Sequence, residues 1–126
     1  MMVAVTQKDR RKQLKQEYKQ TPRAMGIFQI RNIVNGKVFV GSSKNLDGIF
    51  NRHRFALTNG GHINNDLQKD WNDLGREQFA FEILEQLKPN EDPQYDYTED
   101  LLIMEELWLE KLQPFQERGY NKPAKK

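Results

Sequence analysis

A short hairpin signal in the first half of the chain constrains the fold most strongly. The dipeptide Asn35-Gly36 lies between two extended, β-prone stretches, residues 26–32 and residues 37–41. Asn and Gly accept positive φ at both turn positions, so this pattern predicts two antiparallel strands joined by a two-residue turn. We therefore expect a sheet that starts from this hairpin.

The two-residue turn also predicts a register for the hairpin. It would place Asn32 opposite Phe39. Because residues two apart on a strand share a face, Phe28 and Phe39 should lie on the same face of the sheet.

The rest of the chain predicts helices packed on a small sheet. Helices are expected over residues 45–57, with Ser42 or Ser43 as N-cap, from Asn64 or Asn65 to Gly75, and over residues 98–112, with Thr98 as N-cap. Residues 79–84 read as a third strand, 88–97 as a loop, and 7–20 as a polar helix that ends before Pro22. This order predicts an α+β domain.

The composition is that of one small globular domain. The chain has 126 residues, of which 37% are hydrophobic and 30% charged, and it has no cysteine. Disulfides and thiolate metal sites are therefore excluded, and a reducing, cytoplasmic location is expected, with no membrane span and no signal peptide. We divide the chain into a basic N-terminal extension (1–25), a core domain (26–121) and a basic tail (122–126).

Charge is distributed unevenly along the chain. Residues 7–25 carry seven lysines and arginines against two acids, residues 82–110 carry ten acids against one lysine, and residues 111–126 carry five basic groups against one acid. Basic patches of this kind can bind phosphates, although charge alone favours the simpler interpretation of a solvated amphipathic helix and a frayed tail.

Two polar side chains fall on otherwise apolar helix faces. Glu105 lies within the face formed by Leu101, Met104, Trp108, Leu109 and Leu112, and His53 lies within the arc formed by Leu46, Ile49, Phe50, Ala56 and Leu57. A buried carboxylate is costly unless it is paired or binds a metal, and a lone core histidine is more often structural than catalytic. Two such residues in one small domain nevertheless predict a pocket.

The series of short motifs resembles the GIY-YIG nuclease family. Gly26-Ile27-Phe28 and Val38-Phe39-Val40-Gly41 are similar to the two halves of its signature. The similarity continues through Gly41-Ser42-Ser43-Lys44-Asn45-Leu46, His53, His62, Gln68, Trp71-Asn72, residues 79–84, Glu105, Trp108, Leu112 and Gly119-Tyr120-Asn121. It implies a three-stranded antiparallel sheet flanked by helices.

The resemblance also implies a reaction, the hydrolysis of a DNA phosphodiester with one divalent metal, Mg²⁺ or Mn²⁺. Its metal-binding glutamate corresponds to Glu105. Its other catalytic positions correspond to Phe28 and Phe39, where the family has tyrosines, to Ile49, where it has an arginine, and to His53 and Asn121. Glu105, His53 and Asn121 are expected to converge near the two phenylalanines in one cleft, with only weak metal binding in the absence of DNA.

Three of these positions have lost their polar group. Phenylalanine cannot transfer a proton, and loss of one such group usually costs about 10²–10⁴-fold in rate. An arginine at a phosphoryl transition state is worth on the order of 10³–10⁵-fold. The sequence therefore predicts a domain that keeps the fold and loses most or all of the cleavage chemistry.

Three functions remain open at this point. The first is a non-catalytic domain that binds DNA weakly and without sequence preference, through Arg52, Arg54, Lys44, His62 and the basic termini. The second is an active endonuclease in which Arg52 or Tyr18 replaces the lost groups. The third is a protein-interaction module that uses the former cleft or the acidic residues 88–100.

Overall fold

Strands β1 (Gly26–Asn32) and β2 (Val38–Ser43) form the predicted antiparallel hairpin. Strand β3 (Phe79–Gln86) pairs antiparallel with the other side of β1, so the strand order is β2-β1-β3 and β2 is an edge strand. The computed structural model describes residues 24–122, and the helix predicted over residues 7–20 lies outside this range. Within it, the predicted three-stranded antiparallel sheet is confirmed.

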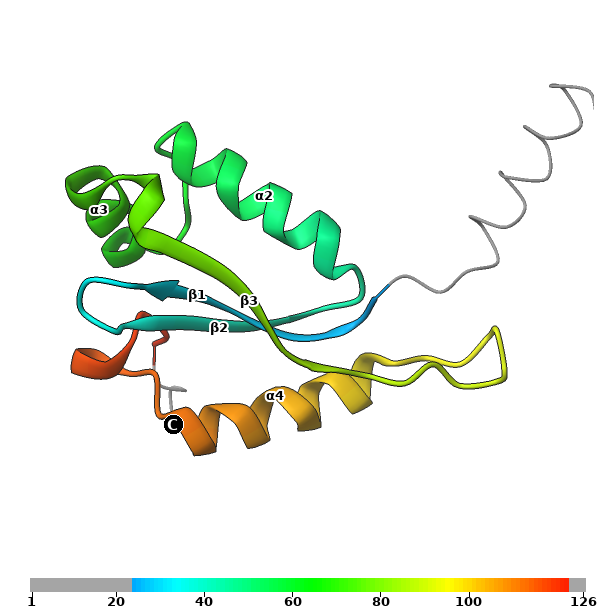
Figure 1. The fold of residues 1–126 in the computed structure, drawn as a ribbon. Helices are drawn as coiled ribbons and strands as arrows, with labels where there is room; N and C mark the ends of the chain where they lie inside the picture. The colour runs from blue at the N-terminus through cyan, green and yellow to red at the C-terminus, as the bar shows by residue number, and fades with distance from the viewer. Residues whose placement is uncertain (1–23, 123–126) are drawn as a thin grey trace, which may run out of the picture.

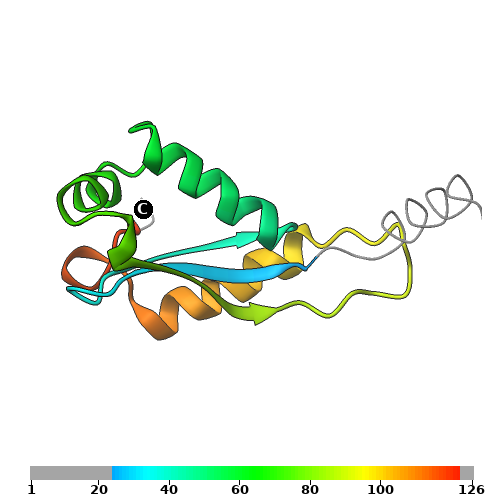
Figure 2. The same ribbon diagram turned by 45° about the horizontal axis from the view of Figure 1, so that its top comes forward.

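Helices cover both faces of the sheet. Helices α2 (Leu46–Thr58) and α3 (Asn65–Leu74) lie on one face, and α4 (Thr98–Leu112) lies on the other (Figures 1 and 2). Short 3₁₀ turns, η1 (Arg76–Gln78) and η2 (Gln116–Arg118), precede β3 and follow α4. None of the helices in residues 24–122 is both long and apolar enough to cross a membrane.

The main core lies between the sheet and the α2–α3 layer. Its buried members are Phe28, Ile30, Leu46, Leu57, Leu67, Trp71, Phe79 and Tyr120. Phe28 packs edge-on against Phe50 of α2, and Trp71 of α3 packs against Phe79 of β3. Alternate residues of each strand thus supply this core, as the period of two in a strand requires.

The hairpin register differs from the prediction by two residues. Phe39 lies opposite Ile30, and Phe28 lies opposite Gly41. The turn is longer than expected because the buried Asn32 accepts hydrogen bonds through Oδ1 from the backbone N–H groups of Val34 and Asn35, at 2.9 and 3.4 Å. A shift of two residues preserves which side chains share a face, so the predicted common face of Phe28 and Phe39 is confirmed.

The predicted caps of α2 and α4 are wrong, although the helix positions are correct. Asn45 caps α2 by accepting a hydrogen bond from Gly48 N, because β2 continues to Ser43 and the Ser43 hydroxyl bonds the backbone of Asn45. Thr98 is itself helical and donates its N–H and hydroxyl to Asp96. The predicted start and end of α3 are confirmed, with Asn64 as N-cap and Gly75 as C-cap.

Candidate functional site

An aromatic and histidine cluster occupies the sheet face below α2. The ring centroids of Phe28 and Phe39 are 6.5 Å apart, and the His53 ring from α2 lies 5.4 Å from Phe28 and 5.5 Å from Phe39. Phe28 is 2% exposed, whereas Phe39 and His53 are partly buried. The structure therefore brings together three of the residues that the sequence singled out.

Steric packing explains why the residue opposite Phe28 is Gly41. A Cβ atom at Gly41 would lie 2.8 Å from Cζ of Phe28. Any larger residue at position 41 would displace the ring, so the second half of the signature ends in a glycine that lets the first half pack against the strand.

His53 is joined to a second histidine. Its Nδ1 lies 2.7 Å from Nε2 of His62, whose own Nδ1 accepts the backbone N–H of Asn64 at 3.0 Å. Burial, together with repulsion from the protonated form of His62 and from Arg52, lowers the pKa of His53 to about 4. The pKa of His62 is also lowered by burial. Both rings therefore favour the neutral form at neutral pH.

Glu105 approaches β2 from the other side. Ser42 donates its hydroxyl to Glu105 Oε2 at 3.3 Å. Burial raises the pKa of Glu105, and the hydrogen bond from Ser42 opposes this shift. Since Phe39 and Ser42 are an odd number of residues apart on one strand, they face opposite sides. Glu105 and His53 thus lie on opposite faces of β2, and not in the single cleft predicted from the sequence.

The chemistry of Glu105 and its surroundings limits any metal site. A hard divalent ion takes six or more oxygen ligands, and Mg²⁺ commonly uses one or two carboxylates together with waters and substrate phosphates. Within residues 24–122, no group of three or more His, Asp or Glu side chains is placed to hold an ion. The donors Glu105 and Ser42 therefore fit an ion shared with a phosphate, and do not form a site made of protein ligands alone.

Asn121 binds the backbone of the edge strand. Its Oδ1 accepts Val40 N–H at 2.8 Å, and its Nδ2 donates to the Val40 carbonyl, also at 2.8 Å. The side-chain amide therefore pairs with β2 as a neighbouring strand would. Both of its polar atoms are engaged by the protein, so the geometry favours a positioning role over contact with a reacting atom.

The position of the missing arginine borders a small cavity. Ile49, Arg52, Ser43, Asn45 and Gly48 line a space of about 150 Å³ at the end of β2. Ile49 is partly buried and Arg52 is exposed. Arg52 is therefore a cation that borders the same cavity as the position where the family has its arginine.

The other predicted DNA contacts differ in their surroundings. Lys44 is exposed and donates to Thr98 Oγ1 at 3.0 Å. The guanidinium of Arg54 lies 4.3 Å from the centroid of the Phe81 ring. His62 is 7% exposed, and both of its ring nitrogens are hydrogen-bonded within the protein. In this conformation His62 has no free ring nitrogen for a phosphate.

Several buried polar residues that support the site escaped the sequence interpretation. Gln68 accepts the His62 backbone N–H through Oε1 and donates to the Leu57 carbonyl. Tyr120 donates its hydroxyl to Asp70 at 2.7 Å and accepts from Asn32 at 3.0 Å. The sequence marks Gln68 and Tyr120 only as members of family motifs, because a linear sequence does not reveal which distant backbone groups a polar side chain satisfies.

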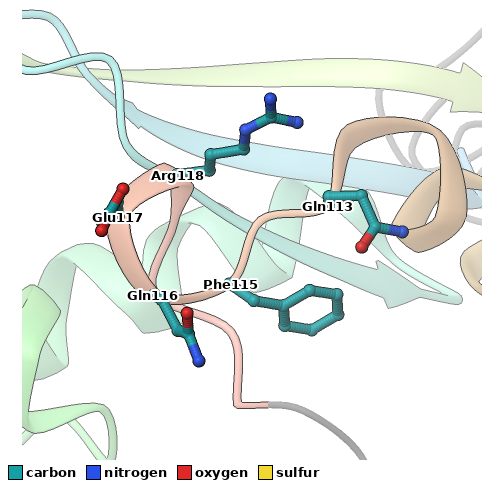
Figure 3. Close-up of a pocket in the computed structure, with 5 residues that line it drawn as sticks. All are labelled: Gln113, Phe115, Gln116, Glu117 and Arg118. Carbon is teal, nitrogen blue, oxygen red and sulfur yellow. The ribbon is translucent and has the colours of Figure 1, made fainter.

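A depression apart from these residues lies where α4 meets η2. Gln113, Phe115, Gln116, Glu117 and Arg118 line it, with a volume of about 320 Å³ (Figure 3). All five come from one continuous segment, and none is among the residues predicted as catalytic, metal-binding or DNA-binding. Phe115 pairs with Asn121 in an isolated β-bridge, so the depression adjoins the segment that carries Asn121.

Comparisons with known proteins agree with this architecture. The family model of the GIY-YIG catalytic domain matches residues 24–121. The chain is 36% identical over 97 residues to the intron-associated endonuclease 1 of Enterobacteria phage T4; the match covers 76% of this chain and 36% of that relative. The chain therefore spans little more than a third of this curated relative.

Two solved structures are similar as well. The catalytic domain of the homing endonuclease I-TevI superimposes with a TM-score of 0.67 at 31% identity, covering 79% of this chain and 99% of that chain. A variant of the catalytic domain of the intron endonuclease I-TevI, with one glutamate replaced by alanine, gives a TM-score of 0.64 at 32% identity, covering 78% and 92%. The similarity to both extends over nearly the whole of the solved domain.

Proposed function

The chain belongs to the GIY-YIG family, and from this premise we propose that it is a nuclease-family domain that binds DNA and cleaves it poorly or not at all. One observation carries the proposal: the positions that the family uses for proton transfer and for phosphate stabilisation hold Phe28, Phe39 and Ile49. Each of the three is at least partly buried in the domain. Hydrocarbon side chains can neither accept a proton nor neutralise a developing negative charge.

The environment of the three side chains supports this proposal. Phe28 packs against the rings of Phe39, Phe50 and His53, and its Cζ, where a tyrosine would carry its hydroxyl, lies against Gly41. A tyrosine at position 28 would gain a hydroxyl for chemistry and would lose part of this burial and packing. Apolar replacement favours stability over activity here, the trade-off expected when a site is no longer selected for its reaction.

The remaining polar groups of the site are better suited to binding DNA phosphates than to cleaving DNA. Glu105 and Ser42 would hold a divalent ion only together with a phosphate of the substrate. When bound, such an ion would supply Lewis-acid stabilisation to that phosphate. Arg52 is exposed beside Ile49 and would meet the DNA backbone, without reading its sequence.

Cleavage assays test the proposal directly. Supercoiled plasmid and single-stranded DNA are incubated with the full chain and Mg²⁺ or Mn²⁺, and binding is followed by fluorescence anisotropy at several salt concentrations. We expect weak binding that declines steeply as salt rises, with no cleavage above background. Metal-dependent cleavage that Glu105→Ala abolishes would mean that the site is rebuilt, and the proposal would be wrong.

A second candidate function has one specific observation in its favour. The outer side of α4 exposes Leu102, Ile103 and Leu107, at 53%, 50% and 61%. Neighbouring exposed apolar side chains on one helix are typical of protein contacts. A protein-interaction module would show no DNA binding at low salt, so the same anisotropy measurement separates the two functions.

A further inference from the structure

The hydrogen bonds of the His53–His62 pair determine which ring nitrogen of each histidine carries the proton. A backbone N–H can only donate, so Nδ1 of His62 must accept the hydrogen bond from Asn64 N. A neutral His62 therefore carries its proton on Nε2. That nitrogen lies 2.7 Å from Nδ1 of His53 and donates to it. His53 must then carry its own proton on Nε2.

Charging either ring would break this chain of hydrogen bonds. An imidazolium donates from both nitrogens. A charged His53 would turn Nδ1–H toward the Nε2–H of His62, and a charged His62 would turn Nδ1–H toward the Asn64 N–H. The rings of Phe28 and Phe39 pack against the two histidines, and the nearby charged group is Arg52. No carboxylate in residues 24–122 bonds to either ring to offset a positive charge.

The free nitrogen of His53 reaches the surface. Nothing in residues 24–122 forms a hydrogen bond with its Nε2. Every buried side-chain nitrogen and oxygen atom in the same part of the chain has a partner. Since Nε2 has none, it is not a fully buried atom, and its N–H can meet an acceptor outside residues 24–122.

We infer that His62 is a positioning residue that holds His53 as a neutral Nε2–H donor, and that this donor binds a phosphate oxygen of DNA. The choice of DNA as the acceptor rests on the proposed function, whereas the hydrogen-bonded arrangement does not. His53 then has no free lone pair with which to take a proton from water. It adds a directional, uncharged contact beside the cationic Arg52.

Nitrogen NMR tests the arrangement in the full chain without DNA. The chain has only two histidines, so the ring resonances are simple to assign. At pH 7 we expect protonated Nε2 in both rings, unprotonated Nδ1 in both, and a scalar coupling across the hydrogen bond between His62 Nε2 and His53 Nδ1. A proton on His53 Nδ1, or a charged ring at pH 7, would overturn the inference.

Two variants separate positioning from mere structural support. His62→Phe keeps the ring volume and removes both nitrogens, whereas His62→Gln keeps one acceptor and one donor. We expect His53 in His62→Phe to lose the shift of a hydrogen-bonded Nδ1, and His62→Gln to restore part of it. Equal His53 spectra in the native protein and in His62→Phe, with both folded, would contradict the positioning role.

The DNA contact has its own readout. Added duplex DNA at low salt should shift the His53 Nε2–H resonance, and His53→Phe should weaken binding roughly tenfold, the effect of losing one hydrogen bond to a charged group. DNA that binds without moving this resonance would overturn the phosphate contact. Absence of any DNA binding would count against the proposed function, while the nitrogen spectra would still decide the role of His62.

Discussion

At the residue scale, the three apolar replacements differ in how easily a polar group can return. Phe28 is 2% exposed, and its Cζ faces Gly41, so a hydroxyl at this position enters a tight space. Burying a hydroxyl without a partner costs about 1–3 kcal/mol. Phe39 is partly buried, and Ile49 borders the 150 Å³ cavity, so larger or polar groups at these positions have an outlet to solvent.

The triple change Phe28→Tyr, Phe39→Tyr and Ile49→Arg should restore some metal-dependent cleavage, measured by plasmid nicking with Mg²⁺ and Mn²⁺. Glu105, His53 and Asn121 are still present, so the change returns the two hydroxyls and the guanidinium that the family has at these positions. Single changes should do little, because groups that act on one transition state have strongly non-additive effects.

The control for this experiment is the same triple variant with Glu105→Ala, which should be inactive. Thermal unfolding must first confirm that the variants fold, since Phe28→Tyr carries the highest cost. A folded triple variant that binds DNA and never cuts it would mean that the geometry of the site, as well as its chemistry, has diverged from the family.

A second residue-scale prediction concerns pH. The pKa of His53 is lowered by burial from 6.5 to about 4. Between these values the unfolded chain binds a proton at this residue and the native protein does not, so stability rises with pH. The pKa difference alone corresponds to about 3.4 kcal/mol, and because the His53 ring is partly exposed, solvent screening reduces this to roughly 2–3 kcal/mol. The contribution is complete above pH 6.5 and is lost as the pH falls toward 4.

Urea unfolding at several values between pH 4 and 7.5 measures this dependence. His53→Gln removes the titrating group and should flatten the pH profile between pH 4 and 6.5. If the native protein and His53→Gln lose stability equally over that interval, the dependence belongs to other groups.

At the element scale, the sequence predicted the positions of helices and strands better than the side-chain hydrogen bonds at their ends. The Asn-Gly turn, the extended apolar stretches and the helix-end signals placed α2, α3, α4 and the three strands, and Gly75 ended α3 as expected. The hairpin register and the caps depended on particular bonds: Asn32 lengthens the turn by bonding the backbone of Val34 and Asn35, and Ser43 bonds Asn45 instead of capping α2. These residues can bond several neighbours, and only the packed structure selects one.

The same limit applies to the candidate site. The helical projection correctly placed Glu105 and His53 on inward faces, and both are partly buried. It could not place the two helices on opposite faces of the sheet, or join His53 to His62 across the intervening loop. A projection describes one helix at a time, whereas a site depends on how the elements pack.

Asn121→Ala should weaken the edge of the sheet. The substitution removes the two hydrogen bonds to Val40, whose side chain is 1% exposed, and leaves two backbone groups of β2 without partners. We expect a loss of about 2–3 kcal/mol in the free energy of unfolding, measured with urea, and faster hydrogen exchange at the Val40 amide.

Two control variants test whether the lost hydrogen bonds to Val40 cause the destabilisation in Asn121→Ala. Asn59→Ala removes a hydrogen bond from an exposed side chain to the Phe55 carbonyl and should cost much less. Asn121→Asp keeps the acceptor for Val40 N–H and sets a carboxylate oxygen against the Val40 carbonyl, so it should not rescue stability. Full stability of Asn121→Asp would show that the bond to the carbonyl contributes nothing.

At the scale of the whole molecule, the net positive charge comes from the two terminal segments and not from residues 24–122. Residues 24–122 contain 11 lysines and arginines against 16 aspartates and glutamates, whereas residues 1–23 and 123–126 together contain nine against two. A core with excess negative charge repels DNA at long range. If the domain binds DNA, most of the attraction must therefore come from the terminal segments, with Arg52 and His53 adding local contacts.

Neutralising basic residues in the N-terminal segment should therefore weaken DNA binding more than neutralising the same number on the core. Each phosphate contact adds about 0.9 to the slope of log affinity against log salt, so removing three should lower that slope by roughly 2–3. Affinity at low salt should fall by about tenfold or more. The variant is Lys8→Gln, Arg10→Gln and Lys12→Gln, and its control is Lys69→Gln, Arg76→Gln and Lys88→Gln, at three exposed core positions.

Both variants change the net charge equally, so a long-range effect of net charge would lower affinity to the same extent in each. Anisotropy titrations with duplex DNA at several salt concentrations distinguish the two cases. A reduced salt slope confined to the N-terminal variant would locate the phosphate contacts in that segment. Equal losses in both variants would mean that net charge alone governs binding, and a loss confined to the core variant would move the contact surface onto the folded domain.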